Sequence, residues 1–156
     1  MDIRDLRIGD IVTTKGLPIL TVKGEYYKIV GIDSKNTFED FVGSVDIQSL
    51  KGRRFFDGRA WADFLEPIPI TDDLLLKLGF DKHDYSDLGL DIEYKLATLK
   101  GFISVSNVSN SKGRDYSVQI DNIAHTSIGG MDFQYLHELQ HIIWDCLHIE
   151  LNTEKL

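Results

Sequence analysis

Short runs of Val, Ile, Tyr and Phe alternate with turn residues through the first 70 positions of the chain. Such β-branched and aromatic runs are typical of strands, and the Gly, Asp and Asn residues between them are typical of tight turns. This half shows no apolar spacing of three and four, the pattern that would indicate a helix. The pattern predicts five strands, over residues 10–14, 20–23, 26–32, 41–47 and 64–68.

Five short strands within about 60 residues indicate a small SH3-like β-barrel. The opening segment Leu6–Val12 supports this prediction, since a Gly-Asp turn that feeds an apolar strand is common at the start of such barrels. After the barrel, Pro67 and Pro69 predict an extended connector, because proline blocks a helix and lacks an N–H donor. The barrel is therefore predicted to occupy residues 1–70.

The second half mixes helical and strand patterns. Thr71 predicts the start of a short helix and Gly79 its end, because threonine caps a helix N-terminus and glycine favours the left-handed position after the last turn. A polar loop, three antiparallel strands and a long helix are predicted to follow; the loop covers residues 81–90 and the strands cover 92–98, 102–108 and 116–120. The predicted fold class is α+β, with an α-β-β-β-α unit over residues 71–156 that packs with the barrel as one unit.

The longest helical pattern in the chain runs from Met131 to His148. At 100° per residue, polar side chains fill one arc of roughly 100° and apolar side chains fill the rest, with Gln140 as the exception. The polar arc holds Gln134, His137, Glu138, His141, Asp145 and His148. An apolar arc this wide predicts a central helix that is buried on two sides and supplies much of the stability of the core.

Within this helix, residues 137–141 read His-Glu-Leu-Gln-His, the H-E-x-x-H spacing of zinc proteases. Histidines at i and i+4 face the same way and can share one Zn²⁺, and the glutamate between them can activate a bound water. A catalytic site needs a third protein ligand, and His148 lies about 10 Å further along the helix axis. We therefore expect a solvent-exposed polar stripe, with no cofactor, no metal ligand and no catalytic residue. The alternative is a small zinc hydrolase with His137 and His141 as ligands and Glu138 as the base.

The formal net charge of −8 is unevenly distributed along the chain. Residues 1–70 carry 10 Lys/Arg against 11 Asp/Glu, a net of −1, whereas residues 71–156 carry 7 against 14, a net of −7. An acidic second half repels phosphate backbones, so a nucleic-acid contact would have to use the first half. The single cysteine, Cys146, and the lack of a long apolar run favour a cytoplasmic protein that does not enter a membrane.

The segment Lys51–Trp61 interleaves four cations with three aromatic residues. Such a segment can pair with phosphates and stack on bases, and arginine and tryptophan also dominate protein-binding surfaces. The simplest interpretation is a barrel loop whose aromatic rings enter the core while its arginines stay in water. If the segment binds a partner, we expect a protein rather than a nucleic acid; the candidate partner-binding residues are Arg53, Arg54, Phe56, Arg59 and Trp61.

Three sequence blocks, Leu6–Val12, Glu66–Phe80 and Tyr135–Gln140, together resemble a family of small uncharacterised proteins encoded in prophages and other mobile elements of gut anaerobes. The blocks occur in the same order and at the same spacing, so the resemblance spans nearly the whole chain. The family usually has His-Gln-Leu-Gln-Asn where this chain has the H-E-x-x-H sequence at 137–141. The resemblance implies a mobile-element setting without an established activity, and it disfavours a zinc site.

The function that these patterns favour is that of a non-enzymatic accessory protein of a mobile element, which works by binding another protein. A nucleic-acid-binding SH3-like module and a zinc-dependent hydrolase are the alternatives. No P-loop, G-x-S-x-G or G-x-G-x-x-G sequence occurs in the chain, so the known motifs of nucleotide binding and serine hydrolysis are absent.

Overall fold

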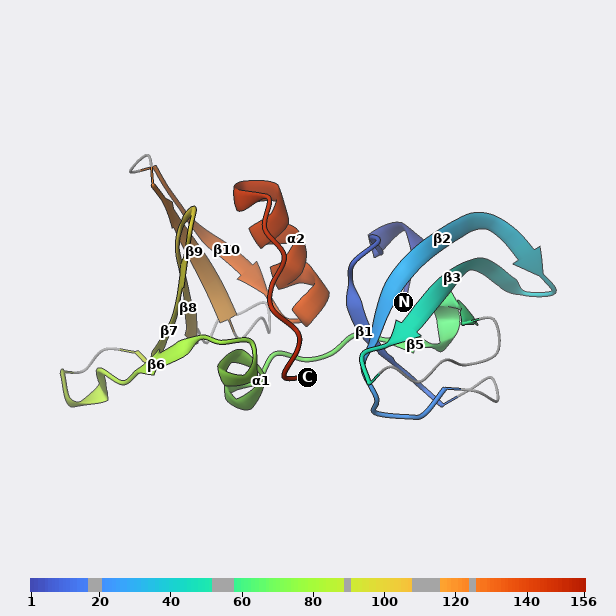
Figure 1. Cartoon of the computed structure of the whole chain (residues 1–156), viewed down its shortest axis with the longest axis horizontal. Coiled ribbons are helices and arrows are strands. Elements are labelled where there is room, and N and C mark those ends of the chain that lie inside the picture. Colours follow the sequence, from blue (N-terminus) through green and yellow to red (C-terminus); the bar gives the residue numbers. More distant parts are fainter. Residues whose placement is uncertain (17–20, 52–57, 89–90, 108–115, 124–125) are drawn as a thin grey trace. The chain divides into compact units, whose positions relative to one another are not determined.

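The computed structural model describes residues 1–16, 21–51, 58–88, 91–107, 116–123 and 126–156. The chain divides into two compact units, Met1–Ile68 (unit 1) and Pro69–Leu156 (unit 2) (Figure 1). Within the described residues, each unit contains one antiparallel sheet, and both α-helices belong to unit 2. The predicted α+β class is therefore confirmed.

Unit 1 is an antiparallel sheet of five strands in the order β4-β3-β2-β1-β5. Its strands are β1 (Ile11–Thr14), β2 (Tyr27–Phe38), β3 (Phe41–Ser49), β4 (Arg59–Trp61) and β5 (Leu65–Glu66), with the 3₁₀ helices η1 (Ile3–Asp5) and η2 (Ala62–Phe64). The sheet is open as far as the described residues show, so closure into a barrel stays a prediction. Strand β4 lies inside the predicted loop Lys51–Trp61, because pairing with β3 imposes an extended backbone on residues that lack a strand pattern of their own.

The core of unit 1 lies between the strands and the two 3₁₀ helices. Its buried members are Leu6, Val12, Tyr27, Ile29, Val45, Ile47, Ala60, Ala62 and Leu65. Met1, Ile3 and Ile32 pack against this cluster while staying partly exposed. All five strands contribute to this core, and six of its nine buried members lie within the strands predicted from the sequence, whereas Leu6, Ala60 and Ala62 lie outside them.

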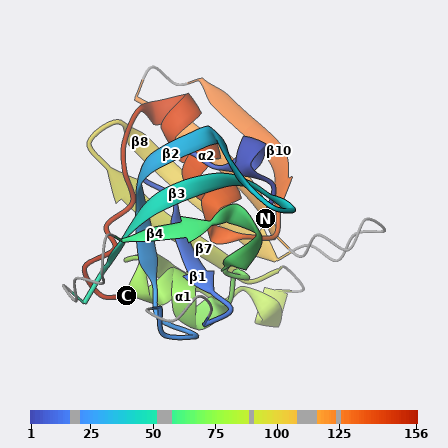
Figure 2. The ribbon, with the colours of Figure 1, turned by 90° about the vertical axis from the view of Figure 1, so that its right-hand side faces the viewer.

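Strands β2 and β3 form a long hairpin that curves along its length (Figures 1 and 2). The sequence predicts a turn near residues 33–36, but these residues belong to β2. The pairing register shifts between Asp33 and Thr37, and the Asp33 carboxylate accepts the N–H groups of Lys35 and Asn36 at 3.1 and 3.2 Å. The turn-like sequence is thus absorbed as an irregularity within the strand, and the true tip lies at Glu39 and Asp40.

Helix α1 (Asp72–Lys77) of unit 2 begins and ends where the sequence predicts. Thr71 Oγ1 accepts the N–H of Leu74 at 3.2 Å, as an N-cap does. At the other end, Gly79 has a φ of +93°, and the N–H groups of Gly79 and Phe80 donate to the carbonyls of Leu76 and Leu75. This is the Schellman pattern of a glycine-terminated helix.

The sheet of unit 2 has five strands in the order β10-β9-β8-β7-β6, two more than predicted. The strands are β6 (Asp81–His83), β7 (Glu93–Thr98), β8 (Gly101–Asn107), β9 (Tyr116–Asn122) and β10 (Ser127–Phe133), and a short 3₁₀ helix, η3 (Ser86–Leu88), follows β6. The two additional strands are the edges of the sheet. Because an edge strand pairs on one side only and tolerates polar residues and glycine, its sequence lacks the apolar alternation of an inner strand.

Helix α2 (Leu136–Leu147) packs on β9 and β10. It begins five residues later than the predicted start at Met131, because residues 131–133 belong to β10. Its buried stripe is Leu136, Leu139, Ile143 and Leu147, together with His137 at 7% exposure, whereas Trp144 is 47% exposed. The prediction that His137 faces solvent and that the apolar arc is buried on two sides is therefore wrong. The predicted polar and apolar arcs are counted from Phe133 as a helical residue, although Phe133 lies in strand β10.

The C-terminal end of α2 is held by the turn between β7 and β8. Lys100 Nζ donates to the carbonyls of Leu147 at 2.8 Å and His148 at 3.2 Å. A lysine at this position satisfies carbonyls that have no partner within the helix and interacts favourably with the helix dipole. The turn therefore fixes the helix against the sheet that it covers.

Candidate functional site

Four aromatic side chains of unit 1 form a row on the surface, which we call the aromatic row: Phe38, Trp61, Phe41 and Phe64. The rings of Phe38 and Trp61 are stacked with centroids 6.5 Å apart, and those of Phe41 and Trp61 with centroids 5.8 Å apart. Phe64 continues the row at 5.2 Å from Phe41 in a tilted arrangement. These separations are those of favourable aromatic pairs.

The row is assembled by the β2–β3 hairpin, strand β4 and the 3₁₀ helix η2, which follows β4 directly in the chain. The β2–β3 hairpin pairs Phe38 directly with Phe41 at its tip. Strand β4 aligns Trp61 with Ser44 of β3, and η2 then brings Phe64 to the other side of Phe41. Phe38 is 58% exposed, and the other three rings are half-buried. An apolar ring this exposed contributes little to the core and is available for contact with another molecule.

The sequence-predicted binding residues meet this row only in part. Trp61 is a member, and Arg59 lies two residues before it in β4, so both side chains point to the same face of the strand. Arg59 Nε is paired with Asp46 Oδ1 at 3.1 Å, with both side chains substantially exposed. Arg53, Arg54 and Phe56 lie outside the described residues. No sequence pattern marks the three phenylalanines, since their contacts depend on hairpin and sheet pairing.

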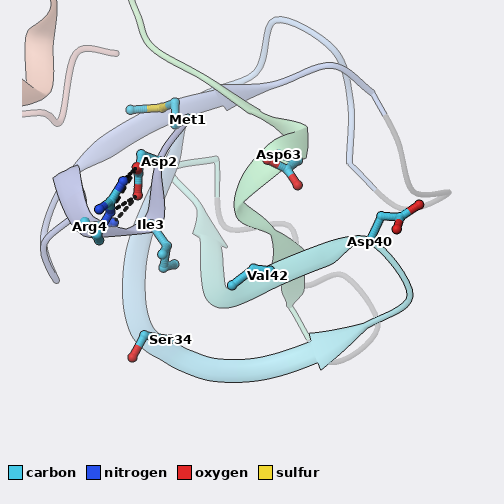
Figure 3. Close-up of a pocket in the computed structure, with 8 residues that line it drawn as sticks. All are labelled: Met1, Asp2, Ile3, Arg4, Ser34, Asp40, Val42 and Asp63. Atoms are coloured by element: carbon cyan, nitrogen blue, oxygen red, sulfur yellow. Dashed lines mark hydrogen bonds and ion pairs between the residues drawn. The ribbon is translucent and has the colours of Figure 1, made fainter.

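A cavity of about 850 Å³ opens beside the tip of the hairpin (Figure 3). It lies between η1, the β2–β3 hairpin and η2, and is lined by Met1, Asp2, Ile3, Arg4, Ser34, Asp40, Val42 and Asp63. Figure 3 shows Ile3 and Val42 in the middle of the cavity, with the Asp2–Arg4 pair on one side and Asp40 and Asp63 on the other. The volume is within the range of pockets that bind small ligands or side chains.

The one cationic side chain in the lining is already engaged. Arg4 Nε donates to both carboxylate oxygens of Asp2 at 3.0 Å. The hydrogen bonds and charge of the Arg4 guanidinium lower the pKa of Asp2 to about 2. Asp40 and Asp63 are exposed, and within the part of the chain that the structure describes neither carboxylate forms an ion pair. The cavity thus presents two carboxylates without an ion-pair partner among the described residues, together with the positively charged N-terminal amine of Met1.

In the His137–His141 segment, the two histidine rings lie edge to face with centroids 5.8 Å apart. Glu138 turns away from this pair toward the start of the helix, where its Oε2 accepts the N–H groups of Gln134 at 2.7 Å and Tyr135 at 3.1 Å. Among the described residues, no group of three or more His, Cys, Asp or Glu side chains could hold a metal ion. The absence of a metal stays the prediction and the zinc hydrolase its untested alternative, while Glu138 caps the N-terminus of α2 in this structure.

Replacing Glu138 with alanine is expected to lower the free energy of unfolding of unit 2 by about 1 kcal/mol, because two N–H groups at the start of α2 lose their acceptor. Glu138→Gln still offers a side-chain oxygen that can accept these two N–H groups, so this variant should retain most of the stability. Urea unfolding followed by Trp144 fluorescence in a Trp61→Phe background measures the change. Glu154→Ala, which removes an exposed carboxylate outside the helix, is the control; a loss no larger than in this control would contradict the capping role.

None of the described helices is long and apolar enough to cross a membrane. Comparison of the chain with family models, with curated proteins and with solved structures gives no match.

Proposed function

We propose that this chain is a non-enzymatic protein-binding factor of a mobile genetic element, and that the aromatic row of unit 1 is its contact surface. The observation that carries the proposal is the stacking of Phe38, Trp61 and Phe41, with Phe38 largely exposed at the end of a hairpin. The mobile-element setting comes from the sequence resemblance alone. The single cysteine, which allows no disulfide within the chain, favours a cytoplasmic partner.

Aromatic residues are the usual anchors of protein interfaces, because they bury a large area at a small cost in conformational entropy. The stacking in the aromatic row reduces that cost further, since each ring is already held by its neighbour before a partner arrives. A partner that covers the row would remove Phe38 from water and complete the burial of the other three rings. The row thus has the composition and the preorganisation of an interaction surface.

The charges beside the row favour a protein over a nucleic acid. Glu39, Asp40 and Asp63 are exposed carboxylates on the same segments that carry the rings, and Arg59 is paired with Asp46. Carboxylates repel phosphate groups, so these three acidic side chains would oppose the stacking of nucleic-acid bases on the rings. A protein surface with cations around an apolar centre meets no such opposition.

We also infer an SH3-like architecture for unit 1. Support comes from the strand order β4-β3-β2-β1-β5 and from the 3₁₀ helix η2, which stands between β4 and the last strand β5. In such small β-rich modules the loops and hairpin tips carry the binding residues while the strands supply a rigid support. The aromatic row, at a hairpin tip and next to η2, has this arrangement.

Photo-crosslinking tests the proposed surface. A photoreactive phenylalanine analogue placed at position 38 of the full chain, expressed in its native host, is expected to crosslink to one defined protein. The same analogue at position 102 is the matched control, because Phe102 is 59% exposed on the sheet of unit 2 and Phe38 is 58% exposed on unit 1.

Excess unlabelled wild-type chain should compete for the partner and suppress the crosslink at position 38. An unlabelled Phe102→Ser chain should compete equally well, and an unlabelled Phe38→Ser chain much less. Equal crosslinking from positions 38 and 102 would show that exposed aromatic rings on this chain are generally adhesive and would refute the proposed surface. The absence of any competable crosslink at position 38 would also refute it.

A further inference from the structure

We propose that the cavity beside the hairpin tip receives a lysine or arginine side chain of the partner protein. This inference rests on the proposed function, because it assigns to the partner a cationic residue next to the apolar area that covers the aromatic row. The cavity has the three properties that such a side chain requires: an apolar floor for its stem, unpaired carboxylates for its charge, and an opening to the surface that the partner covers.

The floor of the cavity is apolar. Ile3 and Val42 lie at its centre, and Val42 is 58% exposed although it belongs to a strand (Figure 3). The methylene stems of lysine and arginine lie readily along apolar surface while their charged ends stay polar. An apolar group without charge could also cover this floor, so the identity of the ligand depends on the charges around it.

The charges that line the cavity come from each of its three walls. From the η1 side, Asp2 and Arg4 neutralise one another through their hydrogen bonds, and the N-terminal amine of Met1 donates to the carbonyl of Ala62 at 3.2 Å. The hairpin tip contributes Asp40, and η2 contributes Asp63, whose carbonyl oxygen but not its carboxylate accepts Lys15 Nζ. Three carboxylates (Asp2, Asp40 and Asp63) against two cations (Arg4 and the N-terminal amine) leave the lining with a net charge of −1, and Asp40 and Asp63 place it on the side of the cavity away from Arg4.

The cavity and the aromatic row are parts of one structural feature. Phe41 and Val42 are adjacent in β3, so their side chains point to opposite faces of the hairpin. Asp40 lies between Phe38 and Phe41 in sequence, and Asp63 immediately precedes Phe64. A partner that holds the tip of the hairpin consequently meets both the aromatic rings and the carboxylates of the cavity, which favours a segment with a cation a few residues from an apolar residue.

Titration of the ¹⁵N-labelled full chain with three blocked nine-residue peptides tests the inference. The peptides share leucine and phenylalanine flanks and differ only at the central residue, which is lysine, glutamine or glutamate. The lysine peptide is expected to shift the amide resonances of Ile3, Asp40 and Asp63, and to bind at least about tenfold more tightly than the other two at low salt. Raising the salt concentration should reduce this preference.

The double variant Asp40→Asn/Asp63→Asn should lose the preference for lysine. Its matched control is Asp87→Asn/Asp91→Asn, which changes the net charge equally but neutralises exposed carboxylates of unit 2. The amide spectrum of each free variant shows whether its fold is intact. Equal affinity for the lysine and glutamine peptides, or an unchanged preference in the Asp40→Asn/Asp63→Asn variant, would overturn the inference.

A fourth probe, N-acetyl-lysine methylamide, separates a partner side chain from a free cationic ligand. If it binds as tightly as the lysine peptide, the cavity takes a small cation and the assignment to a partner protein is overturned. A competable crosslink at position 38 without any lysine preference would leave the aromatic row as a binding surface and overturn the cavity alone. The reverse result, a lysine preference without a crosslink, would place the failure in the proposed function.

Discussion

Replacing Gly101 with alanine is expected to lower the free energy of unfolding of unit 2 by at least about 3 kcal/mol. Gly101 opens strand β8 with a φ of +147°, a conformation that residues with a side chain rarely adopt. A Cβ at this position would lie 2.1 Å from the carbonyl oxygen of Asp121 and 2.7 Å from the Cα of Asn122. Both are backbone atoms of the paired strand β9, so no rotation of a side chain can relieve the clash.

The Gly101→Ala substitution is also expected to weaken the contact of the β7–β8 turn with helix α2, through the adjacent residue Lys100. Lys100 caps the end of α2 through the carbonyls of Leu147 and His148, and a shift of the turn by even an ångström would break those hydrogen bonds. The loss is measured by urea unfolding followed by Trp144 fluorescence in a Trp61→Phe background. Gly130→Ala is the control, because Gly130 also has a positive φ, +75°, but a Cβ there meets no atom within 4 Å.

The control is expected to lose about 1 kcal/mol, the ordinary cost of a side chain in the left-handed region. A Gly101→Ala loss that merely equals the loss in Gly130→Ala would show that the strands β8 and β9 separate easily at this end. It would contradict the tight pairing of Gly101 with Asn122 in the sheet.

The sequence is sufficient to predict α1 because every signal for that helix is local. Thr71 bonds to an N–H three residues away, and Gly79 ends the helix through bonds to residues of its last turn. No distant part of the chain is needed for either interaction. Capping motifs of this kind act within the segment that carries them and can therefore be recognised in a single sequence.

Strands β6 and β10 are not predicted from the sequence, because they depend on pairing with residues elsewhere in the chain. Asp81–His83 is polar and becomes a strand through pairing with Glu93–Lys95, and the Gly-Gly pair of β10 falls where its register with β9 shifts. The same limit explains the error at the start of α2. Phe133 fits the helical spacing by chance, and only its pairing with Tyr116 shows that it is a strand residue.

The candidate site was predictable only at Trp61. Its ring partner Phe38 is 23 residues earlier in the chain, and the two meet because a hairpin and a further strand pair intervene. The cavity depends on three separate elements and has no sequence signature at all. Composition did indicate that this half carries an aromatic and charged surface, but Arg4 and Arg59 are paired with Asp2 and Asp46, whereas Asp40 and Asp63 form no ion pair among the described residues.

Replacing Gly43 with alanine is expected to lower the free energy of unfolding of unit 1 by about 2–3 kcal/mol, and also to reshape the cavity. Gly43 has a φ of +80° within β3, and a Cβ there would lie 2.8 Å from Cγ1 and 3.0 Å from Cβ of Ile3. Ile3 must therefore move, and η1 must move with it. Urea unfolding followed by Trp61 fluorescence in a Trp144→Phe background measures the stability of this unit.

Two further variants separate backbone strain from the contact with Ile3. Gly24→Ala introduces the same strain at a φ of +81° with no atom within 4 Å of the new Cβ, so the excess loss in Gly43→Ala reports the contact. Ile3→Ala in the Gly43→Ala background should recover part of that excess, since it removes the atoms that clash. If Gly43→Ala and Gly24→Ala lower the free energy of unfolding equally, Ile3 moves aside at no cost in free energy, and η1 is not held rigidly beside the cavity. If the excess is present, η1 is held firmly against β3, and the floor of the cavity is preformed before any partner side chain enters it.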